Sequence, residues 1–334
     1  MKYRHLYRWD LDKTYLETDF DSAWALVKTF FQRPADKENV PGSDVLIRAL
    51  RRDSVGSAGI FFLSGSPKQM RRVLQEKLRL DGVYCEQIEL KDNLRNILRG
   101  RFRAIKEQIG FKLPALLSAR VRVSTETTET LFGDDAERDA FVYSLYADLV
   151  AGKIGPHTLE QILDLAKIFP DSRALIYDAL DGIETTQCVQ RIFIHLNRLS
   201  PPIQFDDYGR RLVPIYNYLQ ASIILMLDQR LTPQSVWSIA THFSEEHNYS
   251  EKSHIRSLRD LLRRRLINLA TLHMLNDVKS ESKDLHFSKA IDHIVDTHFR
   301  DASIKRDPTD FEIDYVYLLK RDLLRRQRKG PFGL

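Results

Sequence analysis

The sequence predicts an α/β protein, with a parallel sheet covered by helices on both faces over residues 1–155 and an all-helical segment over residues 156–334. Two observations predict it. In the first part, short apolar runs alternate with amphipathic stretches, which is the rhythm of βαβ units. After a break at Gly155-Pro156, apolar residues recur at helical spacing, for example over 212–227, and no alternating strand is apparent. The 334 residues agree with two domains, at about 150 residues each.

Each apolar run is short enough for one buried strand, and the expected strands are Leu6–Leu11, Ala58–Leu63, Val83–Leu90 and Thr130–Phe132. The amphipathic stretches between and after them give the expected helices, which are Ser22–Phe31, Ser43–Arg51, Lys68–Leu80, Asn93–Ile109 and Asp139–Val150. The first three helices open at residues that are common at helix N-termini.

The composition excludes several protein classes. Hydrophobic residues make up 43% of the chain and charged residues 29%, which excludes extended disorder. The net charge of +5 is no polybasic signature, and two cysteines, Cys85 and Cys188, are too few for a disulfide framework. The start lacks an apolar signal region, and the longest apolar run, Ile223–Leu227, is shorter than the roughly 20 residues that span a membrane. A cytoplasmic protein is therefore expected.

Several common site signatures are absent from the sequence. It contains no GxxxxGK[ST], GxGxxG or G-x-S-x-G motif, which argues against a P-loop motor, a dinucleotide enzyme and a serine hydrolase. His242 and His247 are five residues apart, as are His293 and His298, and this spacing does not align side chains on one helix face. Surface or packing histidines are expected rather than metal ligands.

Two aspartates follow the first apolar run, in Trp9-Asp10-Leu11-Asp12-Lys13-Thr14. Ligands of open α/β sheets bind beyond the carboxyl ends of strands, so Asp10 at a strand end and Asp12 in the next turn can reach one crevice. One carboxylate could attack a substrate or bind a metal while the other transfers a proton. An acidic turn without such a role is the alternative.

A second strand end carries hydroxyl groups, in Phe61-Phe62-Leu63-Ser64-Gly65-Ser66-Pro67. The Ser64 hydroxyl and the backbone N–H groups that follow predict an anion-binding corner. The alternative is a Ser-Gly-Ser turn that caps the next helix, and both can hold together.

Charged residues follow later in the chain. Lys112, in Gly110-Phe111-Lys112-Leu113-Pro114, could contact a phosphoryl oxygen or be an ordinary surface lysine. Asp134 and Asp139 follow the Thr130–Phe132 strand and offer the hard oxygens that suit Mg²⁺. An acidic helix N-terminus is the alternative, above all for Asp135 and Glu137.

These four elements, in this order over residues 6 to about 150, resemble the haloacid dehalogenase (HAD) superfamily of phosphohydrolases, whose fold is a Rossmannoid parallel sheet. More narrowly, Asp10–Thr14 and Ser64–Pro67 are similar to the phosphatidate phosphatase family found with actin patches, and to its bacterial relatives. Tyr143 matches the tyrosine that follows the fourth motif of that family. Asp135 stands where that motif has a serine, and Lys13 where an aspartate is frequent. The resemblance does not extend to residues 156–334.

The resemblance implies a phosphatase with catalytic residues Asp10, Asp12 and Lys112. Asp10 would form an aspartyl-phosphate, and Asp12 would protonate the leaving oxygen and then activate water. Mg²⁺ would be held by Asp10, Asp134 and Asp12, the last through its backbone carbonyl. The other motif residues would bind phosphate or support the site: Ser64, Gly65 and Lys112 at the phosphoryl oxygens, Thr14 in the first loop and Asp139 behind the metal.

The intervals between the motifs bear on the substrate. There are 49 residues between Thr14 and Ser64 and 47 between Ser64 and Lys112, and the expected sheet and helices fill both, so no full cap domain fits. Capless relatives suggest a bulky phosphorylated substrate, such as a lipid headgroup, a protein or a nucleic acid. The narrower resemblance implies phosphatidate or another bulky phosphomonoester. Residues 91–122 carry nine Lys or Arg against two acids, which indicates peripheral contact with an anionic membrane, contact with nucleic acid, or only a solvated helix face.

Two other functions stay open. The basic segment favours a nucleic-acid end phosphatase. The helical part of the chain could instead bind a partner and make the protein a non-catalytic scaffold, or fold over the site as a lid.

Overall fold

Six parallel strands form one sheet, in the order β3-β2-β1-β4-β5-β6. The computed structural model describes residues 3–17, 33–54, 57–91, 109–278, 284–297 and 312–328. The strands are β1 (His5–Asp10), β2 (Ala58–Pro67), β3 (Gln87–Lys91), β4 (Thr128–Asp134), β5 (Val189–His195) and β6 (Leu212–Ile215). The α/β class with a parallel sheet is confirmed.

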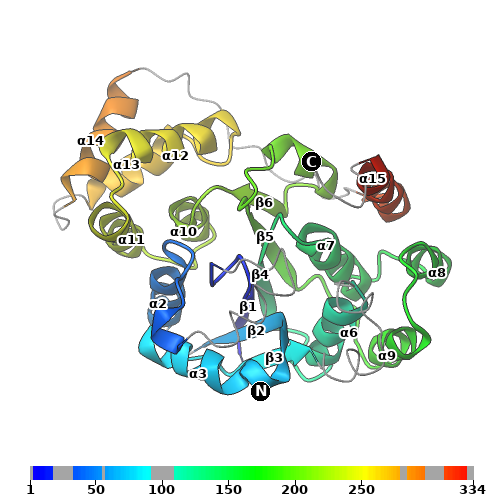
Figure 1. Cartoon of the computed structure of the whole chain (residues 1–334). Helices are drawn as coiled ribbons and strands as arrows, with labels where there is room; N and C mark the ends of the chain where they lie inside the picture. The colour runs from blue at the N-terminus through cyan, green and yellow to red at the C-terminus, as the bar shows by residue number, and fades with distance from the viewer. Residues whose placement is uncertain are drawn as a thin grey trace.

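Helices cover both faces of this sheet (Figure 1). One face packs against α2 (Ser43–Asp53), α3 (Arg71–Leu80), α10 (Tyr218–Leu227) and α11 (Pro233–Glu246). On the opposite face, α6 (Ile109–Arg120) and α7 (Asp139–Val150) lie next to the sheet, and α8 (Pro156–Leu165), α9 (Pro170–Asp181) and α15 (Tyr315–Arg328) lie outside them. The remaining helices, beyond α11, are α12 (Glu251–Arg263), α13 (Leu269–Asp277) and α14 (Leu285–Asp296). Short 3₁₀ turns are η1 (Pro34–Asp36), η2 (Lys68–Met70) and η3 (Pro202–Tyr208).

The central strand β1 explains why the two faces differ. Successive side chains of a strand point to opposite faces, so Tyr7 and Trp9 face α10 while Arg8 and Asp10 face α6 and α7. On the first face, the Trp9 ring stacks on Phe132 of β4 with ring centroids 3.8 Å apart. One face of β1 is therefore apolar core, and the other carries charged groups that need partners.

The expectation of an all-helical segment over residues 156–334 is wrong for β5 and β6, which extend the sheet beyond β4. The apolar stretch 212–227 is not one helix, because its first residues form β6 and α10 begins only at Tyr218. Both strands are short, and a short apolar run has no periodicity that separates a strand from a buried helix. Pro214 lies in β6, which is an edge strand, where a missing N–H is tolerated. The boundary expected at residue 155 is therefore not an edge of the sheet.

The other expected elements have mixed outcomes. The strands at 6–11, 58–63 and 130–132 and the helices at 43–51, 68–80 and 139–150 are present, within a few residues at their ends. The strand expected over Val83–Leu90 begins only at Gln87, because Val83 N–H bonds the Leu78 carbonyl and completes the end of α3. The helix Ser22–Phe31 lies outside the described residues, as does Asn93–Ile109 except for Ile109, where α6 begins. Within the described parts of the intervals between the motifs, no further domain is inserted.

Candidate active site

The ends of β1, β2 and β4 bring the motif residues to one edge of the sheet. Asp10 is the last residue of β1, and Asp134 is the last residue of β4. Ser64 lies in the last part of β2, where the pairing with β3 shifts register. Because these three strands are adjacent and parallel, their carboxyl ends meet at the same edge. The sequence predicted this grouping.

Lys112 of α6 lies at the centre of the charged groups. Its Nζ is 2.9 Å from Asp10 Oδ1, 2.5 Å from Asp139 Oδ1 and 2.8 Å from Glu137 Oε2. The side chain is fully buried, so the alternative of a solvated surface lysine is wrong. Burial alone would lower the pKa of Lys112, but the surrounding carboxylates, led by Asp10, raise it well above its ordinary value. The ammonium therefore stays charged at the base of the site.

Four carboxylates form an acidic cluster around this lysine: Asp10, Asp134, Glu137 and Asp139 each offer one oxygen, and these oxygens all lie within 4.8 Å of one another. Burial raises the pKa of Asp10 and Asp134 well above the ordinary value, and it raises that of Asp139 to about 6. A cluster with more negative charge than one ammonium can balance favours a further cation.

The geometry of Asp134 fits a hard metal ion. Its Oδ1 accepts the backbone N–H groups of Ala136 at 2.5 Å and Glu137 at 3.0 Å, which fixes the carboxylate. Its Oδ2 is buried and accepts no hydrogen bond from the described residues. Asp139 Oδ2 accepts the backbone N–H of Asp134 at 3.2 Å. Carboxylate oxygens held in this way are the ligands that Mg²⁺ prefers.

Gly133 explains how Asp139 comes so close to β4. A Cβ at Gly133 would lie 2.5 Å from both Cβ and Oδ2 of Asp139, closer than side-chain carbons approach. The acidic cluster therefore requires a glycine at position 133, directly before Asp134, because a larger residue would displace Asp139.

Asp12 occupies a separate position beside the cluster. Its Oδ2 accepts hydrogen bonds from Ser64 Oγ at 2.8 Å and Ser66 Oγ at 3.1 Å. Ser64 Oγ in turn accepts the N–H of Ser66 at 2.9 Å, with Gly65 between them. Burial, followed by the negative charge of Glu137, raises the pKa of Asp12 to about 6 although both hydroxyls oppose the shift. Asp12 can therefore exchange a proton near neutral pH.

Two side chains from beyond residue 155 hold the loop that carries Asp12. The hydroxyl of Tyr218 donates to the Thr14 carbonyl at 2.6 Å, and Nδ1 of His195 donates to the Lys13 carbonyl at 3.3 Å. Lys13 itself lies in the left-handed region, with φ 61°. These contacts could not be predicted from the sequence, because His195 and Tyr218 belong to no motif.

Other residues have roles that the sequence left open. Glu137, expected only as a helix N-terminal acid, contacts Lys112 and belongs to the acidic cluster. Asp135 instead accepts the backbone N–H groups of Arg198 at 2.8 Å and Ser200 at 3.1 Å, and so holds the loop after β5. Thr14 is buried, and its hydroxyl makes no hydrogen bond to the described residues.

The basic segment 91–122 lies outside the described residues over 92–108. Of its described members, Lys112 belongs to the site, and Arg120 is buried with Nη1 3.1 Å from Glu129 Oε1. Lys91 is buried, with its ammonium over the Phe111 ring. Arg122 is exposed, unlike the other three described basic residues of this segment. The described part of this segment is therefore no open basic surface.

A pocket of about 150 Å³ adjoins the acidic cluster. Its lining combines charged residues, among them Asp134, Glu137 and Arg321, with apolar residues, among them Phe141, Phe205 and Leu318. Phe205 belongs to η3 and Leu318 to α15, so the second half of the chain supplies part of this wall.

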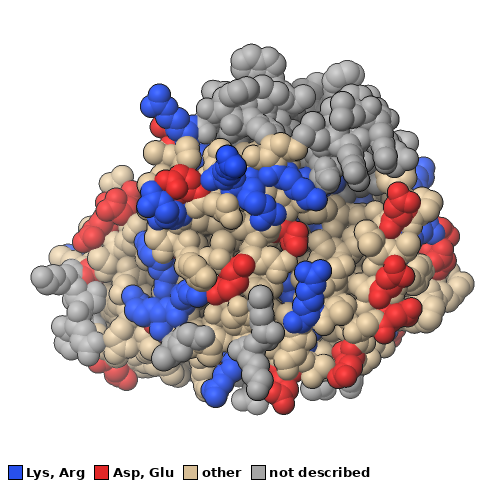
Figure 2. Space-filling model, turned by 90° about the horizontal axis from the view of Figure 1, so that it is seen from below, with Lys and Arg blue, Asp and Glu red and all other residues tan. Residues whose placement is uncertain are grey.

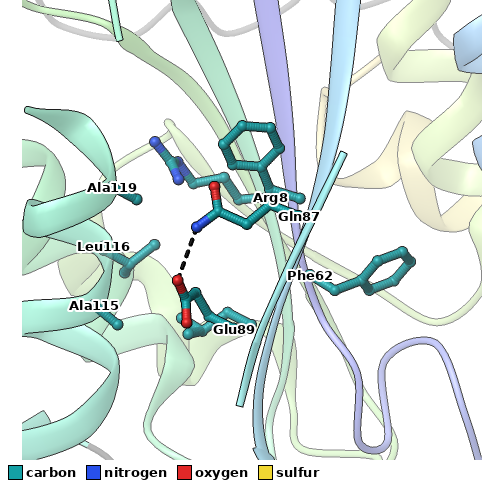
Figure 3. A pocket seen from close by; sticks show the side chains of 9 residues that line it. Arg8, Phe62, Gln87, Glu89, Ala115, Leu116 and Ala119 are labelled. Atoms are coloured by element: carbon teal, nitrogen blue, oxygen red, sulfur yellow. Dashed lines mark hydrogen bonds between the residues drawn. The ribbon is translucent and has the colours of Figure 1, made fainter. Parts of the chain in front are cut away.

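Another pocket lies under α6, between that helix and β2 and β3 (Figure 3). Figure 3 shows Gln87 and Glu89 within it, joined by a hydrogen bond of 2.9 Å. Its volume of about 10 Å³ is close to the minimum for one water molecule. Because none of the candidate catalytic, phosphate-binding or metal-binding residues lines it, this pocket is not the substrate site.

In the comparison with known protein families, residues 9–172 match the family described as "Phosphatidate phosphatase APP1, catalytic domain". This agrees with the resemblance seen in the motifs. Comparison with curated proteins and with solved structures gave no match. Among the described residues, no helix combines the length and apolar character that a membrane span requires.

Proposed function

We propose, from the premise that residues 9–172 belong to the family of phosphatidate phosphatase APP1 catalytic domains, that this chain is a Mg²⁺-dependent phosphatase acting on phosphatidate or a similarly bulky lipid phosphomonoester. The observation that carries the proposal is the convergence of Asp10, Asp134, Asp139 and Lys112 at one edge of the sheet. Phosphoryl transfer depends mainly on positioned charges, and this edge supplies them in a buried setting.

Asp10 is the proposed nucleophile. Its carboxylate attacks phosphorus, the bond from phosphorus to the leaving oxygen breaks, and an aspartyl-phosphate forms. Lys112, 2.9 Å from Asp10 Oδ1, supports this role because its positive charge opposes the effect of burial and favours the ionised carboxylate. Asp139 holds Lys112 from the other side at 2.5 Å.

Asp12 is the proposed acid and base. It gives a proton to the leaving oxygen and then takes one from the water that splits the aspartyl-phosphate, which returns Asp10 to its carboxylate form. The raised pKa of Asp12, about 6, supports both roles near neutral pH. The hydroxyls of Ser64 and Ser66 orient the carboxylate. Ser64 is also the proposed ligand of a phosphoryl oxygen.

The metal would be held by carboxylate oxygens of Asp10 and Asp134, with the backbone of Asp12 at the same edge, as the hard oxygen donors and the free Asp134 Oδ2 favour. Mg²⁺ bound there would neutralise phosphoryl charge. Glu137 contributes a further carboxylate at the rim of the cluster, with its side chain 24% exposed.

A lipid phosphate is the proposed substrate class. Besides the family, the pocket of about 150 Å³ supports it, because its lining combines charged side chains with apolar ones such as Phe141, Phe205 and Leu318. A lipid phosphate likewise joins a charged phosphate to an apolar body.

The test is phosphate release from p-nitrophenyl phosphate, phosphatidate and an end-phosphorylated oligonucleotide, with and without Mg²⁺. We expect Mg²⁺-dependent activity with phosphatidate preferred, and an Asp10→Asn variant without activity. The matched control is Asp171→Asn, an exposed acid in the first turn of α9 that belongs to neither the cluster nor the pocket lining. This control should keep most of the activity.

The other functions give different results. Preference for the oligonucleotide would replace the lipid assignment by an end phosphatase. Inactivity of the folded wild-type protein on all three substrates would favour the scaffold. Activity that survives Asp10→Asn would refute the nucleophile.

A further inference from the structure

A second pocket of about 680 Å³ lies between α10 and α12, away from the acidic cluster. Its floor is polar and buried. Asn217 Nδ2 donates to Ser257 Oγ at 2.9 Å, and Gln220 Nε2 donates to the Ser257 carbonyl and to Asp260 Oδ2, both at 3.1 Å. Because these buried polar groups form hydrogen bonds with one another, the floor of the pocket is rigid and preformed.

Three arginines of α12 line this pocket: Arg256, Arg259 and Arg263. Their spacing of three and four residues places them on one face of the helix, and all three are exposed. Like charges at this spacing repel one another, so the arrangement destabilises the free helix unless an anion lies between them.

The described residues neutralise these three arginines only in part. Asp260 is the one acidic residue that lines the pocket; it accepts Arg264 Nη1 at 2.9 Å and lies 3.4 Å from Arg263 Nη2. Arg259 contacts a histidine ring nitrogen, Nε2 of His293, at 3.1 Å. Arg256 makes no ion pair or hydrogen bond to another described residue. The pocket therefore presents a net positive charge.

Arginines elsewhere in the fold do have acidic partners. Figure 2 shows the face seen from below in Figure 1, where α3 lies, with Lys and Arg gathered over its left and centre. In α2 and α3, Arg48 pairs with Asp44 at 2.7 Å and Arg79 with Glu76 at 2.7 Å. These two arginines each have an acidic partner on their own helix, whereas the three arginines of α12 line one cavity with a single acidic residue among them.

The position of the pocket relates it to the proposed active site. Tyr216 and Asn217 line it and directly follow β6, whose carboxyl end lies at the same edge of the sheet as that of β1. Three strand spacings separate β1 from β6, which is roughly 14 Å across the sheet. Figure 1 shows α10 beside β6, with α12 beyond it.

We propose that this arginine-lined pocket binds the phosphate headgroup of an anionic phospholipid in the membrane that presents the substrate. Arg guanidinium groups form paired hydrogen bonds with phosphate, and a membrane carries many such headgroups in one plane. Occupation of the pocket would hold this edge of the sheet against the membrane, with the acidic cluster facing the same surface. The choice of a membrane rests on the proposed function, whereas the binding itself does not need catalysis.

The experiment measures binding to phosphatidylcholine vesicles with and without phosphatidylglycerol, by co-sedimentation. Phosphatidylglycerol is a phosphodiester, so a phosphomonoesterase does not consume it, and a failure of the proposed activity leaves the binding result intact. We expect binding to the anionic vesicles, with Arg256→Gln, Arg259→Gln and Arg263→Gln each weakening it about fivefold. These residues are exposed and glutamine is a good helix former, so the variants should fold.

The matched control is Arg122→Gln. Arg122 is exposed, carries the same charge and precedes β4, so it lies at the opposite, amino-end edge of the sheet. It should leave vesicle binding unchanged. An equal loss with Arg122→Gln, or no loss with the α12 variants, would overturn the proposal.

Two further arms separate other ligands of similar chemistry. If inorganic phosphate displaces the protein from vesicles at the concentration of the lipid phosphate, the pocket is a small-anion site and the lipid assignment is wrong. If the α12 variants weaken binding of a single-stranded oligonucleotide and leave vesicle binding unchanged, the pocket belongs to nucleic acid and the proposal is refuted.

Discussion

Glu129 of β4 is the group whose replacement should destabilise the fold most clearly. It is fully buried and accepts four hydrogen bonds: Arg8 Nη2 at 2.8 Å and Arg120 Nη1 at 3.1 Å at one oxygen, Arg8 Nε at 2.8 Å and Tyr146 OH at 2.8 Å at the other. One negative charge thus balances two buried guanidinium groups. Arg8 lies on the same face of β1 as Asp10, so this network anchors the strand that carries the proposed nucleophile.

A Glu129→Gln change keeps the shape but removes the charge. One carboxylate oxygen becomes an NH₂ group, so two of the four donors face another donor. Breaking a buried ion pair by removing one partner costs about 3–5 kcal/mol. At about 2 °C for each kcal/mol in a chain of this size, the melting temperature should fall by roughly 6–10 °C.

The assay is urea denaturation together with a thermal scan, on wild type and variants. Tyr146→Phe removes one of the four donors and leaves the charges balanced, so it should cost about 1.5 kcal/mol, less than Glu129→Gln. Glu126→Gln is the matched control, because Glu126 is an exposed acid just before β4, and it should change little. A loss below about 1 kcal/mol for Glu129→Gln would refute the claim that the buried charge is needed.

Three further predictions concern the site and its supporting strands. Tyr218→Phe frees the Thr14 carbonyl, so kcat should fall about tenfold or more while the fold stays intact, as circular dichroism would report. Gly133→Ala pushes Asp139 away, and Mg²⁺ affinity, measured by calorimetric titration, should fall about 10–100-fold. Burial lowers the pKa of His5 to about 3, whereas the pKa in the unfolded chain is about 6.5. Between these two values the unfolded state binds one more proton than the folded state. The free energy of unfolding therefore decreases as the pH is lowered below 6.5, by up to about 1.4 kcal/mol per pH unit. His5→Asn should flatten that slope in urea titrations between about pH 6 and 4.

Each of these has an outcome that contradicts it. Unchanged kcat in Tyr218→Phe would mean that the Thr14 loop keeps its place without the hydroxyl. Gly133→Ala with wild-type Mg²⁺ affinity would show that Asp139 can move without cost. Parallel stability slopes in wild type and His5→Asn would assign the acid sensitivity to other groups.

Residues at strand ends could be predicted from the sequence. Asp10, Ser64 and Asp134 each follow an apolar run, and parallel strands bring their carboxyl ends together without any knowledge of the rest of the fold. Lys112 was placed only by the order of the motifs, since nothing in its immediate sequence distinguishes a buried lysine from an exposed one.

The residues and the strand that were not predicted from the sequence were missed for physical reasons. Glu137 follows β4 near a helix start, where an acid is already explained by the helix dipole, so no signal marked it for the cluster. His195 and Tyr218 act through backbone carbonyls, which carry no sequence pattern at the receiving end. The strand β5 was missed because a strand buried on both faces lacks the alternation that identifies a half-exposed one.

The pairing of β4 with β5 has a consequence for any shortened version of the chain. The family match ends at residue 172, before β5 begins at Val189. A fragment that ends there carries every motif residue, yet it leaves one side of β4 without its neighbour, and six of the seven β4 residues are buried in the full chain. A bare, apolar edge of this kind pairs with other chains, so such a fragment should self-associate into aggregates. The stretch that carries the recognisable motifs is thus smaller than the stretch that must be produced together.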